Sequence, residues 1–305
     1  MPQATTPPPS STSVPGIAAF WHAARHPPAE PTTSYANKTI LITGANIGLG
    51  FEAAQKFAAL GASTLIFGVR SLEKGAAAKT KIEQSTKCQP SVIQLFQVDM
   101  SSFESIDKFV KDVSSKIEKI DIAVLNAGVS VSAYNLSPHG WEMALQINVL
   151  STAYLAILLL PKLRATAAAT GRPSHLEFVA SLGHVFAAVE SVSPTGSERI
   201  LDKVNEKAGF RVFMRYQESK LLEMWVMRQI AVTTSAREVI VVACCPGICK
   251  SNLGRDFGLV LRTLDAVLKW PFTRSAEEGC RTIVSATALG EESHGGFWTN
   301  DELAT

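Results

Sequence analysis

The stretch Thr39-Ile-Leu-Ile-Thr-Gly-Ala-Asn-Ile-Gly-Leu-Gly50 joins a short apolar run to a turn that contains three glycines. The apolar run predicts a buried strand, and the helical pattern that begins at Phe51 predicts a helix directly after the turn. Glycines let backbone N–H groups approach a pyrophosphate, and the N-terminus of the following helix favours its negative charge. The order is Gly-x-x-x-Gly-x-Gly, not the commoner Gly-x-Gly-x-x-Gly. A dinucleotide-binding turn is nevertheless favoured over an ordinary strand-to-helix connection.

The alternation of apolar strand and helix continues along the chain. Further strands are predicted at 64–67, 91–98, 120–125, 175–179, 239–243 and 296–298. Helical periodicity fills the intervals, notably 73–85, 103–117, 141–168, 213–232 and 276–288. Near-continuous apolar strands that alternate with helices predict a parallel sheet with both faces covered. With right-handed crossovers, we expect an α/β, Rossmann-type doubly wound sheet of about seven strands, with ligands at the carboxyl ends of the strands.

Composition indicates a single folded domain behind a different N-terminal segment. The chain has 305 residues, of which 46% are hydrophobic, and residues 37–305 read as one catalytic domain. Residues 1–36 hold eight of the 15 prolines, which predicts a flexible arm. Within it, Ile17–Arg25 is the one part that could form a short helix and dock on the body, because Phe20 and Trp21 would be costly to leave in water.

Charge and cysteine content exclude several classes of protein. The formal net charge is only +2, and no basic cluster predicts nucleic-acid binding. The five cysteines lack metal-ligand spacing, so we expect no metal site and a reducing, cytoplasmic location. The longest apolar run, Leu155 to Leu160, is too short to span a bilayer. The first residues also lack the pattern of a secretory signal.

The end of the second predicted strand points to the cofactor. A site for NAD usually has an acidic residue there, which binds the ribose 2′-hydroxyl. In this chain the place reads Gly68-Val-Arg-Ser71, with no acid and one arginine. Because a guanidinium can bind a 2′-phosphate in bidentate fashion, Arg70 predicts NADP(H). The alternative is a solvated surface arginine.

Tyr216 and Lys220 lie four residues apart in a predicted helix, so both project from one face. A cation beside a phenol favours the phenolate and is expected to bring the pKa of Tyr216 down from about 10. Taken alone, the pair could be a half-buried tyrosine and a solvated lysine. Its position downstream of the phosphate-binding turn makes it a candidate for general acid/base catalysis.

From about 38 to 298, the chain resembles the short-chain dehydrogenase/reductase family. The motifs that carry the resemblance are Thr43-Gly-x-x-x-Gly-x-Gly50, Asp99, Asn126-Ala-Gly128, Asn148, Ser181, Tyr216-x-x-x-Lys220 and Pro246-Gly247. The finer match is to the retinol-dehydrogenase-like branch, particularly fungal members linked to secondary metabolism. It rests on the glycine turn and on Arg215-Tyr-Gln-x-Ser-Lys-Leu-Leu-Glu223.

The resemblance implies a role for each of four catalytic residues. Tyr216 would exchange a proton with the substrate oxygen, and Ser181 would hydrogen-bond the reacting carbonyl. Lys220 would lower the pKa of the tyrosine and bind the nicotinamide ribose. Asn148 would hold a water that links Lys220 to solvent.

The resemblance also implies which residues contact the cofactor. They are Gly44, Asn46, Ile47, Gly48, Gly50, Arg70, Asp99, Met100, Asn126, Ala127, Gly128, Tyr216, Lys220, Pro246, Gly247 and Ser251. Ser251 departs from the threonine that is frequent in the family, although it keeps a hydroxyl group.

Two segments near 184–212 and 248–272 are expected to form the walls of a substrate pocket. His184, Leu253 and Phe257 are the candidate substrate contacts. The first segment could instead be a solvated surface excursion, because it mixes Ser, Pro and Gly with charged residues. The apolar residues of the second segment recur at helical spacing, which is also typical of plain core packing.

The function that these patterns favour is NADP(H)-dependent reduction of a ketone or aldehyde in a mostly apolar small molecule, with Tyr216 as general acid/base. The small-molecule partner is thus a carbonyl compound or the corresponding alcohol. A dehydratase, cyclase or isomerase on the same fold is the alternative, followed by a non-catalytic interaction protein that uses the proline-rich arm. The helix predicted around 141–163 could also pair across a homodimer.

Overall fold

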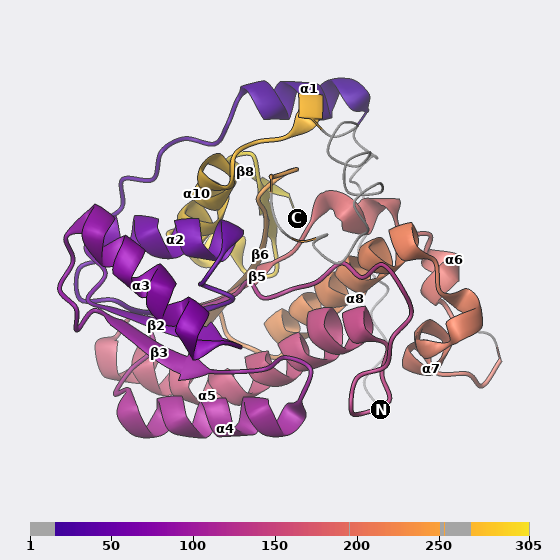
Figure 1. The fold of residues 1–305 in the computed structure, drawn as a ribbon, viewed down its shortest axis with the longest axis horizontal. Coiled ribbons are helices and arrows are strands. Elements are labelled where there is room, and N and C mark those ends of the chain that lie inside the picture. The colour runs from indigo at the N-terminus through magenta and orange to yellow at the C-terminus, as the bar shows by residue number, and fades with distance from the viewer. Residues whose placement is uncertain (1–15, 195, 251–252, 254–269, 305) are drawn as a thin grey trace.

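The computed structural model describes residues 16–194, 196–250, 253 and 270–304. Its centre is an eight-stranded sheet with the order β3-β2-β1-β4-β5-β6-β7-β8 (Figure 1). The strands are β1 (Thr39–Thr43), β2 (Thr64–Val69), β3 (Ile93–Gln97), β4 (Ile122–Leu125), β5 (Ser174–Val179), β6 (Val239–Cys245), β7 (Phe297–Thr299) and β8 (Glu302–Ala304). Neighbouring strands up to β7 pair in parallel, and β8 pairs antiparallel to β7. The predicted Rossmann-type sheet is confirmed.

Helices cover both faces of the sheet (Figure 1). One face packs on α2 (Gly48–Ala59), α3 (Leu72–Thr86) and α10 (Ala276–Ala286). The other packs on α4 (Phe103–Lys116), α5 (Thr152–Thr170) and α8 (Val212–Val232). All five residues of β1 are buried because the strand lies between two such layers. The strand order reverses between β1 and β4, so the crevice for a ligand opens at the carboxyl ends of these two strands.

The helix before α5 has an irregular start that matters for the site. A π-helical segment, η1 (Leu145–Ser151), precedes α5 and carries Asn148. Such π-bulges occur frequently at functional sites. The continuous helix Leu145–Thr170 is long and apolar enough to cross a membrane, but most of its apolar stretch is buried inside the fold. In the described part of the chain it is therefore a core helix.

The sequence failed to predict β8. Asn300 and Asp301 connect β7 to β8, and both have positive φ angles of 50° and 60°. This is the backbone of a tight hairpin turn, for which Asn and Asp are suited. The three-residue strand β8 is too short to leave a periodic pattern.

The segment 184–212 is folded into short elements. These are η2 (Leu182–Phe186), α6 (Val189–Val192), α7 (Ile200–Asn205) and η3 (Lys207–Gly209). Val192 and Val204 are buried in a small cluster with α8. Over its described residues, the segment is thus packed against the body, as a wall would be, and is not a purely solvated excursion.

The described part of the N-terminal arm packs against the body, although Trp21 stays 47% exposed. The helix α1 (Ile17–Arg25) is held near its C-terminus by Arg274, whose Nε donates to Ala23 O at 2.8 Å. Tyr35 is buried and its hydroxyl donates to Val284 O at 2.8 Å. Hydrogen bonds to Arg274 and to Val284, both from the far end of the chain, thus hold this part of the expected flexible arm. Residues 1–15 lie outside the described ranges.

Candidate active site

The turn between β1 and α2 has the geometry of an anion site. Gly44 and Gly48 adopt φ angles of +70° and +59°, in the left-handed region that glycine tolerates best. The N–H of Gly44 donates to Gly68 O at 2.8 Å, which fixes the turn against β2. The first turn of α2 holds no acidic residue, and Ile47 makes no side-chain cap bond. The N–H groups at this helix end are thus left for a negatively charged ligand.

The end of β4 is fastened to the end of β1 by Thr43. Its Oγ1 accepts from the N–H groups of Asn126 and Ala127, each at 3.0 Å. The side-chain amide of Asn126 donates to Thr43 O at 2.8 Å. Asn126-Ala-Gly128 therefore lies along the glycine turn, where small residues leave room for a flat ligand.

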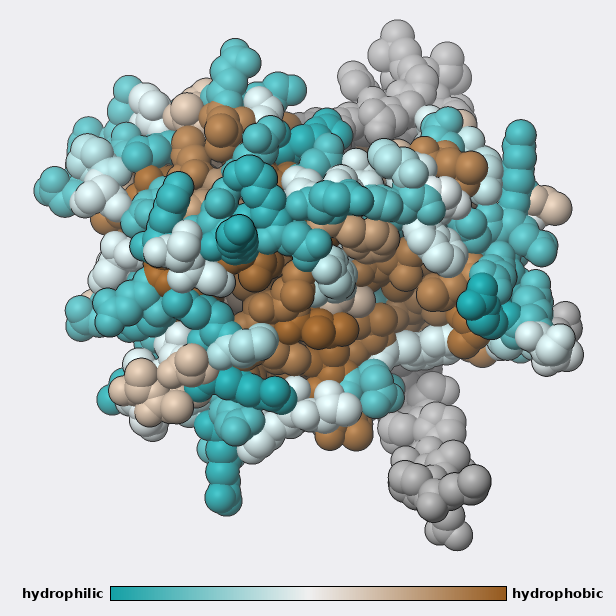
Figure 2. Space-filling model, turned by 90° about the horizontal axis from the view of Figure 1, so that it is seen from below, coloured by the Kyte–Doolittle hydropathy of each residue, from teal (hydrophilic) through white to brown (hydrophobic). Residues whose placement is uncertain are grey.

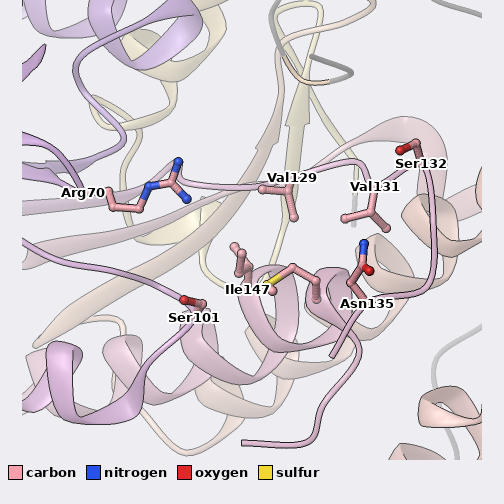
Figure 3. A pocket seen from close by; sticks show the side chains of 8 residues that line it. Arg70, Ser101, Val129, Val131, Ser132, Asn135 and Ile147 are labelled. Carbon is pink, nitrogen blue, oxygen red and sulfur yellow. The ribbon is translucent and has the colours of Figure 1, made fainter. Parts of the chain in front are cut away.

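Arg70 stands at the mouth of a cavity of about 300 Å³ (Figure 3). Its side chain is exposed at the end of β2. The cavity is lined by Arg70, Ser101, Val129, Val131, Ser132, Asn135, Met143 and Ile147. In Figure 3 the guanidinium lies across the open space from Ser101. No carboxylate lines this cavity among the described residues, so a phosphate there would meet a cation and no repelling anion.

The two other predicted cofactor contacts after β3 differ from one another. The carboxylate of Asp99 is partly exposed and accepts from the N–H and hydroxyl of Ser101 at 2.9 and 2.7 Å. The Met100 side chain is buried in the core under the sheet. A contact from Met100 to a cofactor would therefore use its backbone. Both assignments remain predictions.

Ser181, Tyr216 and Lys220 come together at the carboxyl end of β5. Ser181 lies just after β5, where its Oγ accepts from Gly183 N at 3.0 Å, and the ring of Tyr216 lies beside the same glycine. Tyr216 and Lys220 are one turn apart on α8, with Lys220 Nζ 5.9 Å from the centre of the Tyr216 ring. The structure thus brings together three of the four predicted catalytic side chains.

The net effect of this environment on the pKa of Tyr216 differs from the prediction. Burial raises the pKa, whereas the Lys220 cation and the nearby Ser181 side chain lower it; Glu223 and Cys245 raise it further. The net result is a pKa above the ordinary value. The cation acts in the predicted direction, but desolvation of the phenolate outweighs it.

The ammonium of Lys220 is buried and held by two partners. Its Nζ donates to Val179 O at 2.8 Å and to Glu223 Oε2 at 2.6 Å. Burial alone would lower the pKa of Lys220, but the charges of Glu223 and Tyr216 outweigh burial and raise it. Glu223 was not recognised as a candidate from the sequence. In the sequence, only its position three residues after Lys220 points to a pair, and opposite charges at this spacing are common on any helix.

Asn148 joins the end of β4 to α8. Its Nδ2 donates to Val129 O at 2.9 Å and to Ser219 Oγ at 3.0 Å, and its Oδ1 accepts from Val129 N at 2.9 Å. Ser219 directly precedes Lys220 on α8. The Asn148 side chain thereby ties the π-helical segment η1 to the catalytic helix. The water that it would hold remains a prediction.

A buried ion network also connects these two helices, and sequence reasoning missed it. Arg215, next to Tyr216, faces Glu142 at 3.7 Å and Glu218 at 3.4 Å. Glu142 accepts from the N–H groups of Ala144 and Leu145, each at 3.0 Å, at the start of the helix that carries Asn148. The network fixes the relative position of both helices. The order of polar and apolar residues in the sequence does not reveal that these charged side chains are buried.

The predicted substrate contacts are placed only in part. His184 Nδ1 lies 2.7 Å from Ser181 O, and its ring packs edge-on against Phe297 of β7 at 5.0 Å. The carbonyl of Leu253 accepts from Ser130 N at 3.4 Å, beside the end of β4. Ser251, Phe257 and most of 248–272 lie outside the described residues. Pro246 and Gly247 follow β6, and Gly247 has a φ of +81°.

No group of three or more His, Cys, Asp or Glu side chains in the described ranges could hold a metal ion. The residues at the carboxyl ends of β1, β2 and β4 instead fit a dinucleotide. An uncapped helix end offers N–H groups, Gly48 has open space beside it, and Arg70 faces the cavity.

Known proteins resemble this chain over most of its length. A family model described as short chain dehydrogenase matches residues 38–172. The short-chain dehydrogenase/reductase ffsI of Aspergillus flavipes is 59% identical, over 96% of this chain and 86% of the relative. The short-chain dehydrogenase/reductase phmF of Phaeosphaeria nodorum is 58% identical, over 94% of this chain and 84% of the relative.

Solved structures share the fold at lower identity. The Pseudomonas aeruginosa RhlG/NADP active-site complex has a TM-score of 0.65 and 22% identity, and covers 89% of this chain and 97% of its own. L-Sorbose reductase from Gluconobacter frateurii, complexed with NADPH and L-sorbose, has a TM-score of 0.64 and 20% identity, and covers 88% of this chain and 97% of its own. These likenesses concern the fold alone.

Proposed function

Because this chain belongs to the short-chain dehydrogenase/reductase family, we propose that it is an NADP(H)-dependent oxidoreductase that reduces a ketone or aldehyde. The observation that carries the proposal is that the side chains of Ser181 and Tyr216 both lie beside Gly183, with Lys220 one turn away from Tyr216 on α8. Two hydroxyl groups thus lie side by side where both can donate to one carbonyl oxygen. Donors aimed at an oxygen that gains negative charge stabilise the transition state.

Each residue has a defined task in this mechanism. Bound NADPH would supply the hydride that makes the substrate oxygen negative. Tyr216 gives its proton to that oxygen, while Ser181 donates a hydrogen bond to it. After Tyr216 has given up its proton, the Lys220 cation stabilises the resulting phenolate. Asn148 is proposed to hold the water through which a proton returns from solvent.

The cofactor preference rests on Arg70. Its guanidinium faces the cavity at the end of β2, and a 2′-phosphate would bind it through charge-assisted hydrogen bonds. The pyrophosphate would lie at the N-terminus of α2, and Asp99 would accept from the adenine amino group. The NADP and NADPH in the names of the two solved structures support a nicotinamide cofactor of this type.

The raised pKa of Tyr216 fits the role of a proton donor in the reductive direction. Burial keeps the phenol protonated at neutral pH, so the side chain is ready to donate a proton and not to accept one. A mostly apolar substrate, such as a secondary metabolite, is supported by Val129, Val131, Met143 and Ile147 in the cavity wall.

We propose a homodimer because of exposed apolar side chains, and a cytoplasmic location because of the free cysteines. Figure 2 shows apolar side chains gathered on the face of the molecule on which α5 lies. Ile157 of α5 and Trp225 of α8 are among the exposed large apolar residues. A homodimer that covers this part of the molecule would remove them from water. Five free cysteines are consistent with a reducing, cytoplasmic environment.

The test is NADPH oxidation with a panel of ketones and aldehydes, for the purified parent protein and for Tyr216→Phe. We expect turnover by the parent and a loss of about 10²- to 10⁴-fold in the variant, with NADPH affinity kept. Absence of both NADPH binding and turnover would rule out the proposal. Product formation that survives in Tyr216→Phe without cofactor turnover would favour a dehydratase, cyclase or isomerase.

A further inference from the structure

Glu223 lies less than one helical turn after Lys220 on α8, and only 2% of its surface is exposed. Its Oε2 is 2.6 Å from Lys220 Nζ. We propose that Glu223 is a positioning residue: a buried counter-ion that fixes the Lys220 ammonium and partly neutralises the charge that Tyr216 experiences. This role rests on the proposed function only in that Tyr216 is the residue that donates the proton to the substrate.

The hydrogen bonds of Lys220 support a fixed position for the ammonium. An ammonium has three N–H donors. One donates to Val179 O, the last residue of β5, at 2.8 Å, and another to Glu223. Val179 lies two residues before Ser181, so the strand that presents Ser181 also holds Lys220. Two partners in different elements restrict a side chain that is otherwise flexible.

The charges around Tyr216 give Glu223 a second effect. Lys220 and Glu223 act from the same helix, Ser181 from the end of β5, and Cys245 from β6. Lys220 in turn faces Glu223, Tyr216 and Cys244. Of these groups, Lys220 is the cation that lowers the pKa of Tyr216, and Glu223 opposes it. Glu223 therefore helps Tyr216 to keep its proton, as a proton donor must.

Stability alone is a poor explanation for this pair. Desolvation of two charges offsets much of their attraction, and an apolar pair of the same size is often equally stable or more stable. Burial raises the pKa of the Glu223 carboxyl, although Lys220 opposes this effect. A pair that contributes little to stability but controls the charge next to Tyr216 is better explained by the chemistry.

The decisive experiment titrates Tyr216 without substrate or cofactor. The ultraviolet absorbance of tyrosinate is followed against pH for the full-length parent, Glu223→Gln, Tyr216→Phe and the double variant. The curve of Tyr216→Phe is subtracted from that of the parent, and the curve of the double variant is subtracted from that of Glu223→Gln. This removes the absorbance of Tyr35, Tyr134 and Tyr154. Glutamine keeps the size of the side chain and an oxygen that accepts from Lys220, but it removes the negative charge.

We expect Tyr216 to ionise at lower pH in Glu223→Gln than in the parent. At a fixed pH on the rising part of the curve, the ionised fraction should increase on the order of threefold. An unchanged curve, or one that moves to higher pH, overturns the proposal. Glu223→Asp, which keeps the charge, is expected to stay closer to the parent and provides the comparison if the glutamine variant does not fold.

Glu218→Gln is the matched control. Glu218 is a buried carboxylate on the same helix, but it pairs with Arg215 at 3.4 Å and not with Lys220. Its loss should leave the titration of Tyr216 in place, even if α8 is destabilised. An equal shift in Glu218→Gln would indicate a general effect of helix stability and would overturn the specific role of Glu223.

The titration separates this inference from the proposed activity. If carbonyl reduction is absent but the curve moves as expected, the function fails while the relation between Glu223 and Tyr216 stands. If reduction is present, the alkaline decline of its kcat/KM should also move to lower pH in Glu223→Gln. Reduction with an unmoved titration would keep the function and remove Glu223 from it.

Discussion

The side-chain amide of Asn126 fills the space into which any side chain on Gly50 would project. The carbonyl of Gly44 crowds the same place. Gly50 is therefore required by close packing between α2, the first turn and the end of β4, and not by an unusual backbone angle. The glycine turn and Asn126-Ala-Gly128 form one unit, because each fixes the other.

Gly50→Ala is expected to disturb this unit. The new methyl group must displace the Asn126 amide, which donates to Thr43 O, and such overpacking costs about 1–3 kcal/mol. Urea unfolding should show the loss of stability, and fluorescence titration should show weaker NADPH binding. Gly209→Ala is the control, because nothing lies within 4 Å of the added carbon. Equal stability of both variants would contradict the packing argument.

Arg70→Ala tests the preference for the phosphorylated cofactor. Hydrogen bonds to a charged group are worth about 1.5–3 kcal/mol, so the Kd of NADPH should rise on the order of 10- to 100-fold. The Kd of NADH should stay nearly constant, since it lacks the phosphate. Arg172→Ala removes an exposed arginine at the opposite end of the sheet, before β5, and should change neither value. Parallel losses for NADPH and NADH would assign Arg70 to another role.

The raised pKa of Tyr216 predicts the pH dependence of the reaction. Reduction needs the protonated phenol, and a raised pKa keeps the phenol protonated to higher pH. The kcat/KM for carbonyl reduction should thus be level through neutral pH and fall only in the alkaline range. Oxidation of the corresponding alcohol needs the phenolate and should rise there. A reductive profile that declines below pH of about 8 would mean that a group other than a raised-pKa tyrosine donates the proton.

Arg274→Met should release the N-terminal helix α1. The buried guanidinium donates to Ala23 O at 2.8 Å and to Asn300 Oδ1 at 2.6 Å, and methionine makes neither bond. Hydrogen bonds from a charged group are worth about 1.5–3 kcal/mol each. Limited proteolysis should then cleave within residues 16–30, while the exposed Arg237→Met control stays resistant. Resistance of both variants would show that other contacts suffice to hold α1.

The sequence predicts the central strands well because each is a short segment rich in buried apolar residues and bounded by turn or helix signals. The predicted 39–43 coincides with β1, and 175–179 differs from β5 by one residue. Tyr216, Lys220 and Ser181 were found because their spacing follows a family pattern. The structure brings these three side chains together.

The features that were missed depend on contacts between distant segments. Glu223 follows Lys220 at a spacing that exposed helices use freely, so its burial is not visible in the sequence. The net direction of the Tyr216 pKa was wrong because desolvation, which outweighs the cation, depends on the packed fold. The docking of 16–36 depends on Arg274 and Val284, whose positions relative to the arm no local pattern reveals.

The hydrogen bonds by which Arg274 holds α1 have a consequence for synthesis on the ribosome. Ala23 and Arg274 are 251 positions apart, and Asn300 comes later still. At about 5–20 residues per second, α1 emerges on the order of 10–50 s before its anchor is made. Through that interval the carbonyl of Ala23 lacks the guanidinium that holds it in the folded protein. The helix α1 is thus made early but is among the last parts of the described chain to be secured, and a nascent chain stopped short of Arg274 leaves it open to chaperones and proteases.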